Sequence, residues 1–255
     1  MRKKLTIGLV LLAAFILFTV LVKTVDVKPI GRQGTDVGMA TVNEWFNGLT
    51  AYHETLYKVT EYVGYLAFAV IGAFGLLGLK QLIERRSLIK VDRDILLLGG
   101  FYVVVLACYV LFEKLVINYR PIYAGEEELE ASYPSSHTLL FVAVMTTAVM
   151  QLIVRARGTV YEKVMMCLFT AAGLFMVVGR AFCGVHWLTD ILGGMLLAAA
   201  LVSVYAALAF PDGIRKPDGK YPHGNNLNRF GGVYAGPPIN CVYAGPEMFE
   251  KESEK

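Results

Sequence analysis

The sequence predicts an all-α protein, an integral membrane bundle of six transmembrane helices. Of its 255 residues, 56% are hydrophobic and 18% are charged, a balance more apolar than that of a typical soluble domain. Six apolar runs, each about 17–24 residues long, have the length that a helix needs to cross a bilayer. These runs cover residues 5–24, 62–82, 94–113, 138–154, 162–179 and 187–210. None of them alternates polar and apolar residues along its length, which favours helices over membrane β-strands.

The composition divides the chain into two parts. Residues 1–210 contain all six apolar runs and form the predicted membrane domain. The first run follows three cationic residues at 2–4 but has no small-residue cleavage pattern after it, which favours an uncleaved anchor over a secretory signal. Residues 211–255 are rich in Gly, Pro and Asn and are expected to form a loosely ordered tail.

Lysine and arginine residues predict how the helices are oriented. They cluster in residues 2–4, 85–93, 155–163 and 215–220, which an alternating six-helix plan places on one side of the membrane. The positive-inside rule makes that side cytoplasmic. Both termini, including the tail, are therefore expected in the cytoplasm, and the opposite helix ends are expected on the extracytoplasmic side.

Three short polar segments lie at those extracytoplasmic ends. They contain cations, serines, histidines and one carboxylate: Lys114, Arg120, Ser135, Ser136, His137, Arg180, His186 and Asp190. A charged residue costs about 2.5–3.5 kcal/mol at the centre of a lipid-facing helix, so these residues are expected to face water or the interior of the bundle. Their joint occurrence predicts an anion site. The net charge of +3 is too small to indicate a nucleic-acid partner.

His186 and Asp190 are candidates for a nucleophile and the group that orients it. They are four residues apart at the start of the last predicted helix and would share one helical face. A carboxylate that accepts a hydrogen bond from one ring nitrogen fixes the tautomer and leaves the other nitrogen with its lone pair. The alternative is a His–Asp pair that only stabilises a helix end, and the pair alone favours that alternative.

Three cations are candidate phosphate ligands. Arg180, Arg120 and Lys114 lie at the ends of predicted helices or in the loop that follows. A guanidinium holds two phosphate oxygens at once, and an ammonium adds a point charge. The alternative for each cation alone is an anchor at the headgroup level, which is common at the ends of membrane helices.

A serine pair and a histidine precede the fourth apolar run. Ser135 or Ser136 is expected to cap the helix, so that its free N–H groups form an anion site. His137 follows them directly and is placed to donate a proton to a departing oxygen. The alternatives are an ordinary N-cap and an interfacial histidine.

Together these residues resemble the three-part signature of the type 2 phosphatidic acid phosphatase superfamily, which also includes bacterial haloperoxidases that use vanadate. The third part, Ser-Arg, five residues, His, three residues, Asp, matches from Arg180 through His186 to Asp190 with every spacing kept. The second part, Pro-Ser-Gly-His, matches at Pro134, Ser135 and His137. The six-helix plan resembles the membrane branch of that family.

The chain departs from the signature at three positions. Five residues separate Lys114 from Arg120 where the family has six, and Glu113 occupies the expected lysine position. One residue of helix turns a side chain by about 100° and shifts it by about 1.5 Å, which the long lysine stem has to compensate. Ser136 replaces the usual glycine, and Gly179 replaces the usual serine and removes one hydroxyl contact.

The resemblance implies a metal-independent phosphatase without a cofactor. His186 would attack phosphorus and form a phosphohistidine, Asp190 would orient it, and His137 would protonate the leaving oxygen. The groups implied to hold the phosphoryl oxygens are Lys114, Arg120, Arg180 and the backbone N–H groups near Ser135 and Ser136. The sequence contains no His, Cys, Asp or Glu cluster with metal-ligand spacing. The implied substrate is a lipid phosphate of the polyprenyl diphosphate, phosphatidylglycerophosphate or phosphatidate type.

Other functions stay open from the sequence. A lipid-to-acceptor phosphotransferase would use the same residues, and the shape of the pocket decides between water and a second acceptor. An anion or lipid transporter is another alternative, although the polar residues cluster at one membrane face and the chain shows no repeated halves. A catalytically inactive lipid-binding relative is a third alternative. The presence of His137, His186 and Asp190 argues against it.

The expected location is the plasma membrane of a bacterium.

Overall fold

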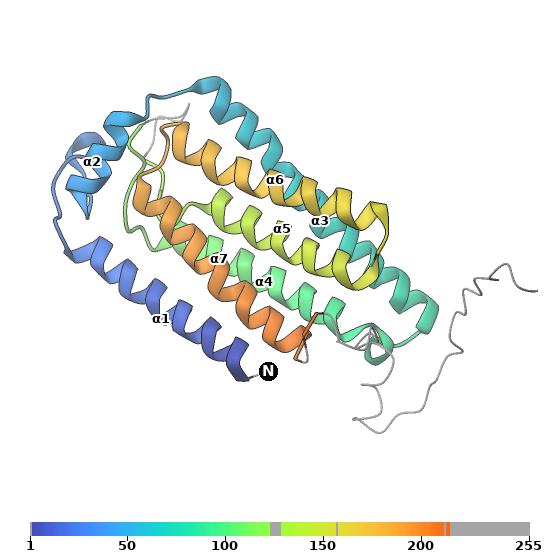
Figure 1. The fold of residues 1–255 in the computed structure, drawn as a ribbon. Helices are drawn as coiled ribbons and strands as arrows, with labels where there is room; N and C mark the ends of the chain where they lie inside the picture. Colours follow the sequence, from blue (N-terminus) through green and yellow to red (C-terminus); the bar gives the residue numbers. More distant parts are fainter. Residues whose placement is uncertain (1, 123–128, 157, 212, 215–255) are drawn as a thin grey trace, which may run out of the picture. The chain divides into compact units, whose positions relative to one another are not determined.

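The computed structural model describes residues 2–122, 129–156, 158–211 and 213–214, and these residues form a helical bundle with no strand among them (Figure 1). Its α-helices are α1 (Arg2–Thr24), α2 (Ala40–Leu49), α3 (Glu54–Arg85), α4 (Arg93–Lys114), α5 (Ser136–Arg155), α6 (Val160–Phe182) and α7 (Leu188–Ala209). Two short 3₁₀-helices lie in the connections, at Arg32–Gly34 and Leu88–Lys90.

Every helix except α2 is long and apolar enough to cross a membrane, which confirms the predicted all-α fold with six membrane helices. The largest difference from the predicted ranges is at α3, which begins at Glu54 rather than at residue 62. Its first turns are polar, and a Glu54–Lys58 ion pair of 2.6 Å joins two of them. The predicted tail at 211–255 lies outside the described residues except for 211, 213 and 214, and its role stays a prediction.

Helices α5 and α7 form the centre of the bundle and bury more of their length than the other membrane helices. Helix α7 packs against α1, α5 and α4, and α5 also packs against α6, α3 and α4. Two glycines in the first turns of α7 permit the loop before α5 to approach closely. A Cβ at Gly193 would lie 2.6 Å from the Tyr133 ring, and one at Gly194 would lie 2.9 Å from the Ser135 carbonyl oxygen. This contact fixes the start of α5 beside the start of α7.

The short helix α2 is fastened to the start of α7. Asn43 Oδ1 accepts a hydrogen bond from the Thr189 N–H at 3.1 Å, and Asn43 Nδ2 donates to Thr189 Oγ1 at 3.0 Å. The same Nδ2 donates to the Gly38 carbonyl at 2.9 Å. A distant segment therefore satisfies a free N–H group at the N-terminus of α7, and α2 lies at the end of the bundle that carries the polar segments (Figure 1).

A second polar cluster lies at the opposite end of the bundle. Asp94 of α4 is 1% exposed, and its Oδ2 forms an ion pair of 2.7 Å with Nη1 of Arg155 in α5. Arg155 also donates to Oε1 of Gln151, and Gln151 Nε2 donates to the Tyr205 hydroxyl of α7 at 2.5 Å. The cluster joins three membrane helices around a buried carboxylate, which needs a cation to remain charged.

We expect Arg155→Ala to lower the free energy of unfolding by about 2–3 kcal/mol, because the buried Asp94 carboxylate loses a cation contact. Thermal denaturation in detergent measures the change. Arg93→Ala, which removes an exposed arginine from the same end of α4, is the matched control and is expected to change stability by less than about 0.5 kcal/mol. Equal destabilisation by the two variants would contradict the role of the Asp94–Arg155 pair.

Candidate active site

The three polar segments predicted from the sequence meet at one end of the bundle. Successive membrane helices run in opposite directions, so the ends of α4 and α6 lie at the same end of the bundle as the starts of α5 and α7 (Figure 1). The structure gathers His137, Arg180, His186 and Asp190 there. Arg120 joins them from the loop between α4 and α5.

His186 lies in the connection between α6 and α7 and not on a helix. Because α7 begins at Leu188, the predicted helical face shared with Asp190 does not form. The His186 Nδ1 atom lies 3.6 Å from Asp190 Oδ2, beyond hydrogen-bond distance. The connection turns at Gly184, which has a φ of 78° and where a Cβ would lie 2.9 Å from the Ala51 carbonyl oxygen. Glycine fits this turn because it has no Cβ.

Ser132 lies between His186 and Asp190. Its Oγ is 3.3 Å from His186 Nδ1, and it donates a short hydrogen bond to Asp190 Oδ2. The same Oδ2 accepts from the Trp187 N–H at 2.8 Å and so caps the start of α7. The predicted His–Asp pair is therefore connected through a serine hydroxyl, with Nδ1–H donating to Oγ and Oγ–H donating to the carboxylate.

Arg180 determines which nitrogen of His186 carries the proton. Its Nη2 lies 3.3 Å from His186 Nε2. A guanidinium can only donate, so Nε2 accepts and the ring proton is on Nδ1. Burial, followed by the positive charges of Arg180, Arg120 and His137, lowers the pKa of His186 well below 6.5. The ring is therefore neutral at neutral pH, with a lone pair on Nε2.

Arg180 is completely buried, which excludes an anchor at the headgroup level. Its Nη1 forms an ion pair of 2.8 Å with Oε1 of Glu61 in α3 and donates to Thr60 Oγ1 at 3.4 Å. Its guanidinium lies 5.2 Å from the centre of the Tyr57 ring, which is a cation–π distance. Gly179 permits this packing, because a Cβ at that position would lie 2.6 Å from Thr60 Cγ2. The glycine that replaces the signature serine therefore has a structural reason.

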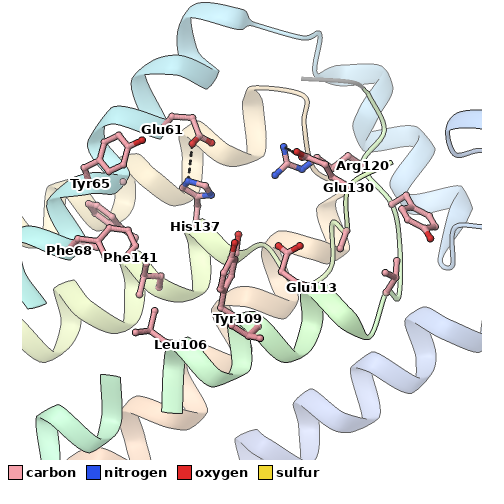
Figure 2. A pocket seen from close by; sticks show the side chains of 18 of the residues that line it. Glu61, Tyr65, Phe68, Leu106, Tyr109, Glu113, Arg120, Glu130, His137 and Phe141 are labelled. Atoms are coloured by element: carbon pink, nitrogen blue, oxygen red, sulfur yellow. Dashed lines mark ion pairs between the residues drawn. The ribbon is translucent and has the colours of Figure 1, made fainter. Parts of the chain in front are cut away.

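His137 lies in the first turn of α5 and contacts the same glutamate (Figure 2). Its Nε2 is 3.3 Å from Glu61 Oε2. One carboxylate thus contacts Arg180 with one oxygen and His137 with the other. The imidazole packs against α3 at Gly64, where a Cβ would lie 3.2 Å from His137 Cδ2.

The loop between α4 and α5 holds Arg120. Its Nη1 forms an ion pair of 2.5 Å with Oε2 of Glu130. An antiparallel bridge between Tyr119 and Ala131 joins the two sides of the loop. The Tyr119 carbonyl also accepts a hydrogen bond from Trp187 Nε1–H at 2.7 Å. These contacts hold the arginine near the start of α7.

The two serines at the start of α5 have different surroundings. Ser135 is the N-cap, and its Oγ accepts from the Thr138 N–H at 3.5 Å and from the Thr138 hydroxyl at 3.1 Å. The Ser135 N–H donates to the Asp190 carbonyl at 2.9 Å. Ser136 is the first residue of the helix and lines the cavity next to His137. Ser135 therefore has a structural role in the cap, and Ser136 is the serine that faces the cavity.

Lys114 is the last residue of α4 and is exposed. The residues that line the cavity include the neighbouring Glu113 and Arg120 but not Lys114 (Figure 2). Because one residue turns a helical side chain by about 100°, the shortened spacing in the first segment directs a carboxylate and not an ammonium toward the cavity.

A cavity of about 900 Å³ lies between α3, α4 and α5 beside these residues (Figure 2). Charged and titratable groups gather at one part of its wall: Glu61, Glu113, Arg120, Glu130 and His137. The remaining wall is mostly apolar and aromatic: Tyr65, Phe68, Leu106, Tyr109, Val110 and Phe141. A cavity with polar groups on one part of its wall and apolar groups on the rest fits an amphiphile.

Two residues of the cluster, Glu61 and Ser132, are not among those that the sequence predicted. Glu61 directly precedes the apolar run at 62–82, and a carboxylate beside a membrane span is a weak signal for a functional residue. Ser132 has no signal in the sequence, because its contacts arise only when the loop before α5 folds against α7.

Comparisons with known proteins give a family-model match and a similar solved structure. Residues 96–213 match the sequence model of the PAP2 superfamily, and the matched segment includes all the site residues predicted from the signature. A comparison with curated protein sequences finds no match.

Among solved structures, the chain is similar to a phosphatase from Bacillus subtilis, which is described as the first transmembrane PAP2 type phosphatidylglycerolphosphate phosphatase. The two share 16% sequence identity with a TM-score of 0.58, and the likeness covers 78% of this chain and 94% of that chain. At this identity the likeness shows a shared fold. The shared fold and the six apolar helices support an integral membrane protein with a transmembrane PAP2-type fold, and its residues 96–213 are similar to the PAP2 superfamily.

Proposed function

We propose that the protein is a membrane lipid phosphatase that hydrolyses a phosphomonoester or diphosphate of a lipid through a phosphohistidine. The observation that carries the proposal is the state of His186. Its ring is neutral, Ser132 lies beside its Nδ1, and a buried guanidinium contacts its Nε2. An imidazole in this state is a nucleophile next to a group that binds phosphate oxygens.

In the proposed reaction, His186 Nε2 attacks phosphorus in line with the bond to the leaving oxygen. The N–P bond forms as that P–O bond breaks, and His137 gives its proton to the departing oxygen. Water then attacks the phosphohistidine, His137 takes the proton from that water, and phosphate is released. Ser132 and Asp190 stabilise the positive charge that develops on the ring through Nδ1–H.

The cations stabilise the charge on the phosphoryl oxygens, which is the main catalytic requirement in phosphoryl transfer. Arg180 and Arg120 bind these oxygens, and the Arg180 N–H that contacts the nucleophilic nitrogen turns to an oxygen of the substrate. The N–H groups at the start of α5, near Ser135 and Ser136, add the positive end of a helix. Lys114 is exposed at the end of α4 and contributes through its charge at longer range.

The cavity supports a substrate with a lipid tail. Its apolar wall is formed by α3, α4 and α5, which are all membrane-spanning helices. An acyl or prenyl chain would bury apolar surface along this wall while its phosphate lies among the charged groups. Polyprenyl diphosphate, phosphatidylglycerophosphate and phosphatidate all have this form, and the similar solved structure is named as a phosphatidylglycerolphosphate phosphatase.

The proposed location of the site is the extracytoplasmic side of a bacterial plasma membrane, with both termini in the cytoplasm. Lys and Arg residues support this orientation. The Lys and Arg residues within 2–4, 85–93 and 155–163 lie at the end of the bundle opposite His186. The positive-inside rule predicts that this end faces the cytoplasm.

We expect His186→Ala to reduce phosphate release by at least about 10³-fold, because the nucleophile is lost. Purified wild type and variant are assayed in detergent with the three classes of lipid phosphate. EDTA is present, so that the same assay tests the proposed independence of metal. His53→Ala removes an exposed histidine at the start of α3 and is expected to keep wild-type activity.

Several outcomes of this assay would change the proposal. Equal release by wild type and His186→Ala would overturn the role of the nucleophile. No release by the wild type from any lipid would favour a binding or transport function. Release that requires a second acceptor would favour the phosphotransferase.

We expect Ser132→Ala to lower kcat by about tenfold, which corresponds to the loss of roughly one hydrogen bond to the developing imidazolium. KM is expected to change little, because Ser132 lies on the side of the ring away from Arg180. Ser203→Ala is the matched control, since the Ser203 hydroxyl forms an exposed hydrogen bond to a carbonyl of its own helix, at Ala199. An unchanged kcat in Ser132→Ala would contradict the connection through the serine hydroxyl.

The orientation is tested by labelling single cysteines in a variant whose native cysteines are replaced. Glu44→Cys places an exposed thiol on α2, and Ile89→Cys places one in the connection at the other end of the bundle. We expect a membrane-impermeant thiol reagent to label Glu44→Cys in intact cells and Ile89→Cys only after permeabilisation, because the reagent reaches only the outer side. The reverse pattern would place the site in the cytoplasm.

A further inference from the structure

We propose that Glu61 is a specificity-determining residue whose carboxylate occupies the phosphate subsite of the resting site. This inference rests on the proposed phosphatase function. It extends that function by explaining how the site distinguishes a lipid phosphate from free inorganic phosphate.

The contacts of Glu61 are those of a bound anion. Its Oε1 lies 2.8 Å from Arg180 Nη1, and its Oε2 lies 3.3 Å from His137 Nε2. The Nη2 atom of the same guanidinium contacts His186 Nε2 at 3.3 Å. A carboxylate and a phosphate group use the same oxygen geometry toward a guanidinium. Glu61 therefore contacts two of the groups that the reaction requires and lies near the third.

Glu61 also lies between the cavity and the buried part of the site. It lines the cavity together with His137, whereas Arg180 and His186 are 0% and 2% exposed and do not line it. A phosphate that comes from the cavity therefore has to take the place of the Glu61 carboxylate before it can contact Arg180 or the nucleophilic nitrogen.

The carboxylate and a phosphate cannot share this subsite. Like charges a few ångströms apart in a poorly solvated site repel strongly. His137 Nε2 must also leave Glu61 to give its proton to the leaving oxygen. The Glu61 side chain is long and 32% exposed, so it can turn into the cavity.

The neighbours of Glu61 support displacement over a role in positioning. Arg180 keeps its contacts with Thr60 Oγ1 at 3.4 Å and with the Tyr57 ring at 5.2 Å when the carboxylate moves. His137 stays packed against α3 at Gly64. These contacts hold the arginine and the histidine in place when the phosphate takes over the role of the carboxylate.

Displacement of an internal carboxylate raises the binding energy that a ligand has to supply. A lipid phosphate can supply it from its tail, which buries apolar surface against the cavity wall, whereas inorganic phosphate has no such part. Glu61 therefore weakens the binding of free phosphate more than it weakens that of a lipid substrate, which limits inhibition by the product.

The test compares wild type with Glu61→Gln, which keeps the size of the side chain and removes its charge. We expect the dissociation constant of inorganic phosphate to fall by about tenfold or more, because a like charge leaves the subsite. Thermal denaturation in detergent over a range of phosphate concentrations, at constant ionic strength, measures this constant without any turnover. The inhibition constant of phosphate in lipid hydrolysis is expected to fall in parallel, and KM for the lipid is expected to fall by a smaller factor.

Glu113→Gln is the matched control, because it removes a carboxylate from the same cavity wall that has no ion pair with Arg180 or His137 in the described structure. We expect phosphate to bind this variant within about threefold of wild type. Unchanged or weaker phosphate binding by Glu61→Gln would overturn the inference, as would an equal gain in both variants. If Glu61→Gln does not fold, Glu61→Asp tests the same point, since its shorter side chain cannot contact both partners and is expected to bind phosphate more tightly than wild type.

The two proposals fail in different ways. A wild type that hydrolyses no lipid phosphate would refute the phosphatase function, and the denaturation assay would still measure whether Glu61 competes with phosphate. Hydrolysis that is lost in His186→Ala, combined with no gain in phosphate binding by Glu61→Gln, would refute only the role of Glu61.

Discussion

The buried guanidinium of Arg180 is the constraint on which the rest of the site depends. A cation without solvent is tolerated only where neighbours compensate its charge and accept its hydrogen bonds. Glu61, Thr60 and Tyr57 supply a carboxylate, a hydroxyl and an aromatic face, and all three belong to α3. Helix α6 must therefore approach α3 closely, and Gly179 permits it because any Cβ there would collide with Thr60.

The same cation sets the state of His186. An N–H of the Arg180 guanidinium donates to Nε2 of the His186 ring. Burial and the charge of the guanidinium keep the imidazole neutral. The other nitrogen then carries the proton and contacts Ser132, which donates to Asp190. Because Asp190 also caps α7 through the Trp187 N–H, the group proposed to orient the nucleophile is fixed by the start of a helix. The geometry of the site is thus a consequence of how three helix ends pack.

The sequence predicts the parts of this arrangement that depend on local composition and spacing. The six membrane helices follow from apolar length, since a chain in lipid satisfies its backbone groups as helices. Arg180, His186 and Asp190 were predicted from their joint place at helix ends and from their resemblance to a family signature. Glu61 and Ser132 do not, because each contributes through a contact with a distant segment. The helical face shared by His186 and Asp190 was predicted wrongly, since the position at which α7 begins depends on the Asp190 cap.

Among the described residues, carboxylates contact Arg120, Arg180 and His137 in the resting site. Glu130 pairs with Arg120, and Glu61 pairs with both Arg180 and His137. In the proposed phosphatase, phosphate takes the place of a carboxylate at this site. The electrostatic gain is then a difference between two similar contacts and is small. The discrimination between ligands then depends on the apolar wall of the cavity, where only a ligand with a lipid tail gains additional binding energy. In this proposal, recognition of the phosphate and of the tail is coupled through the Glu61 carboxylate that the phosphate replaces.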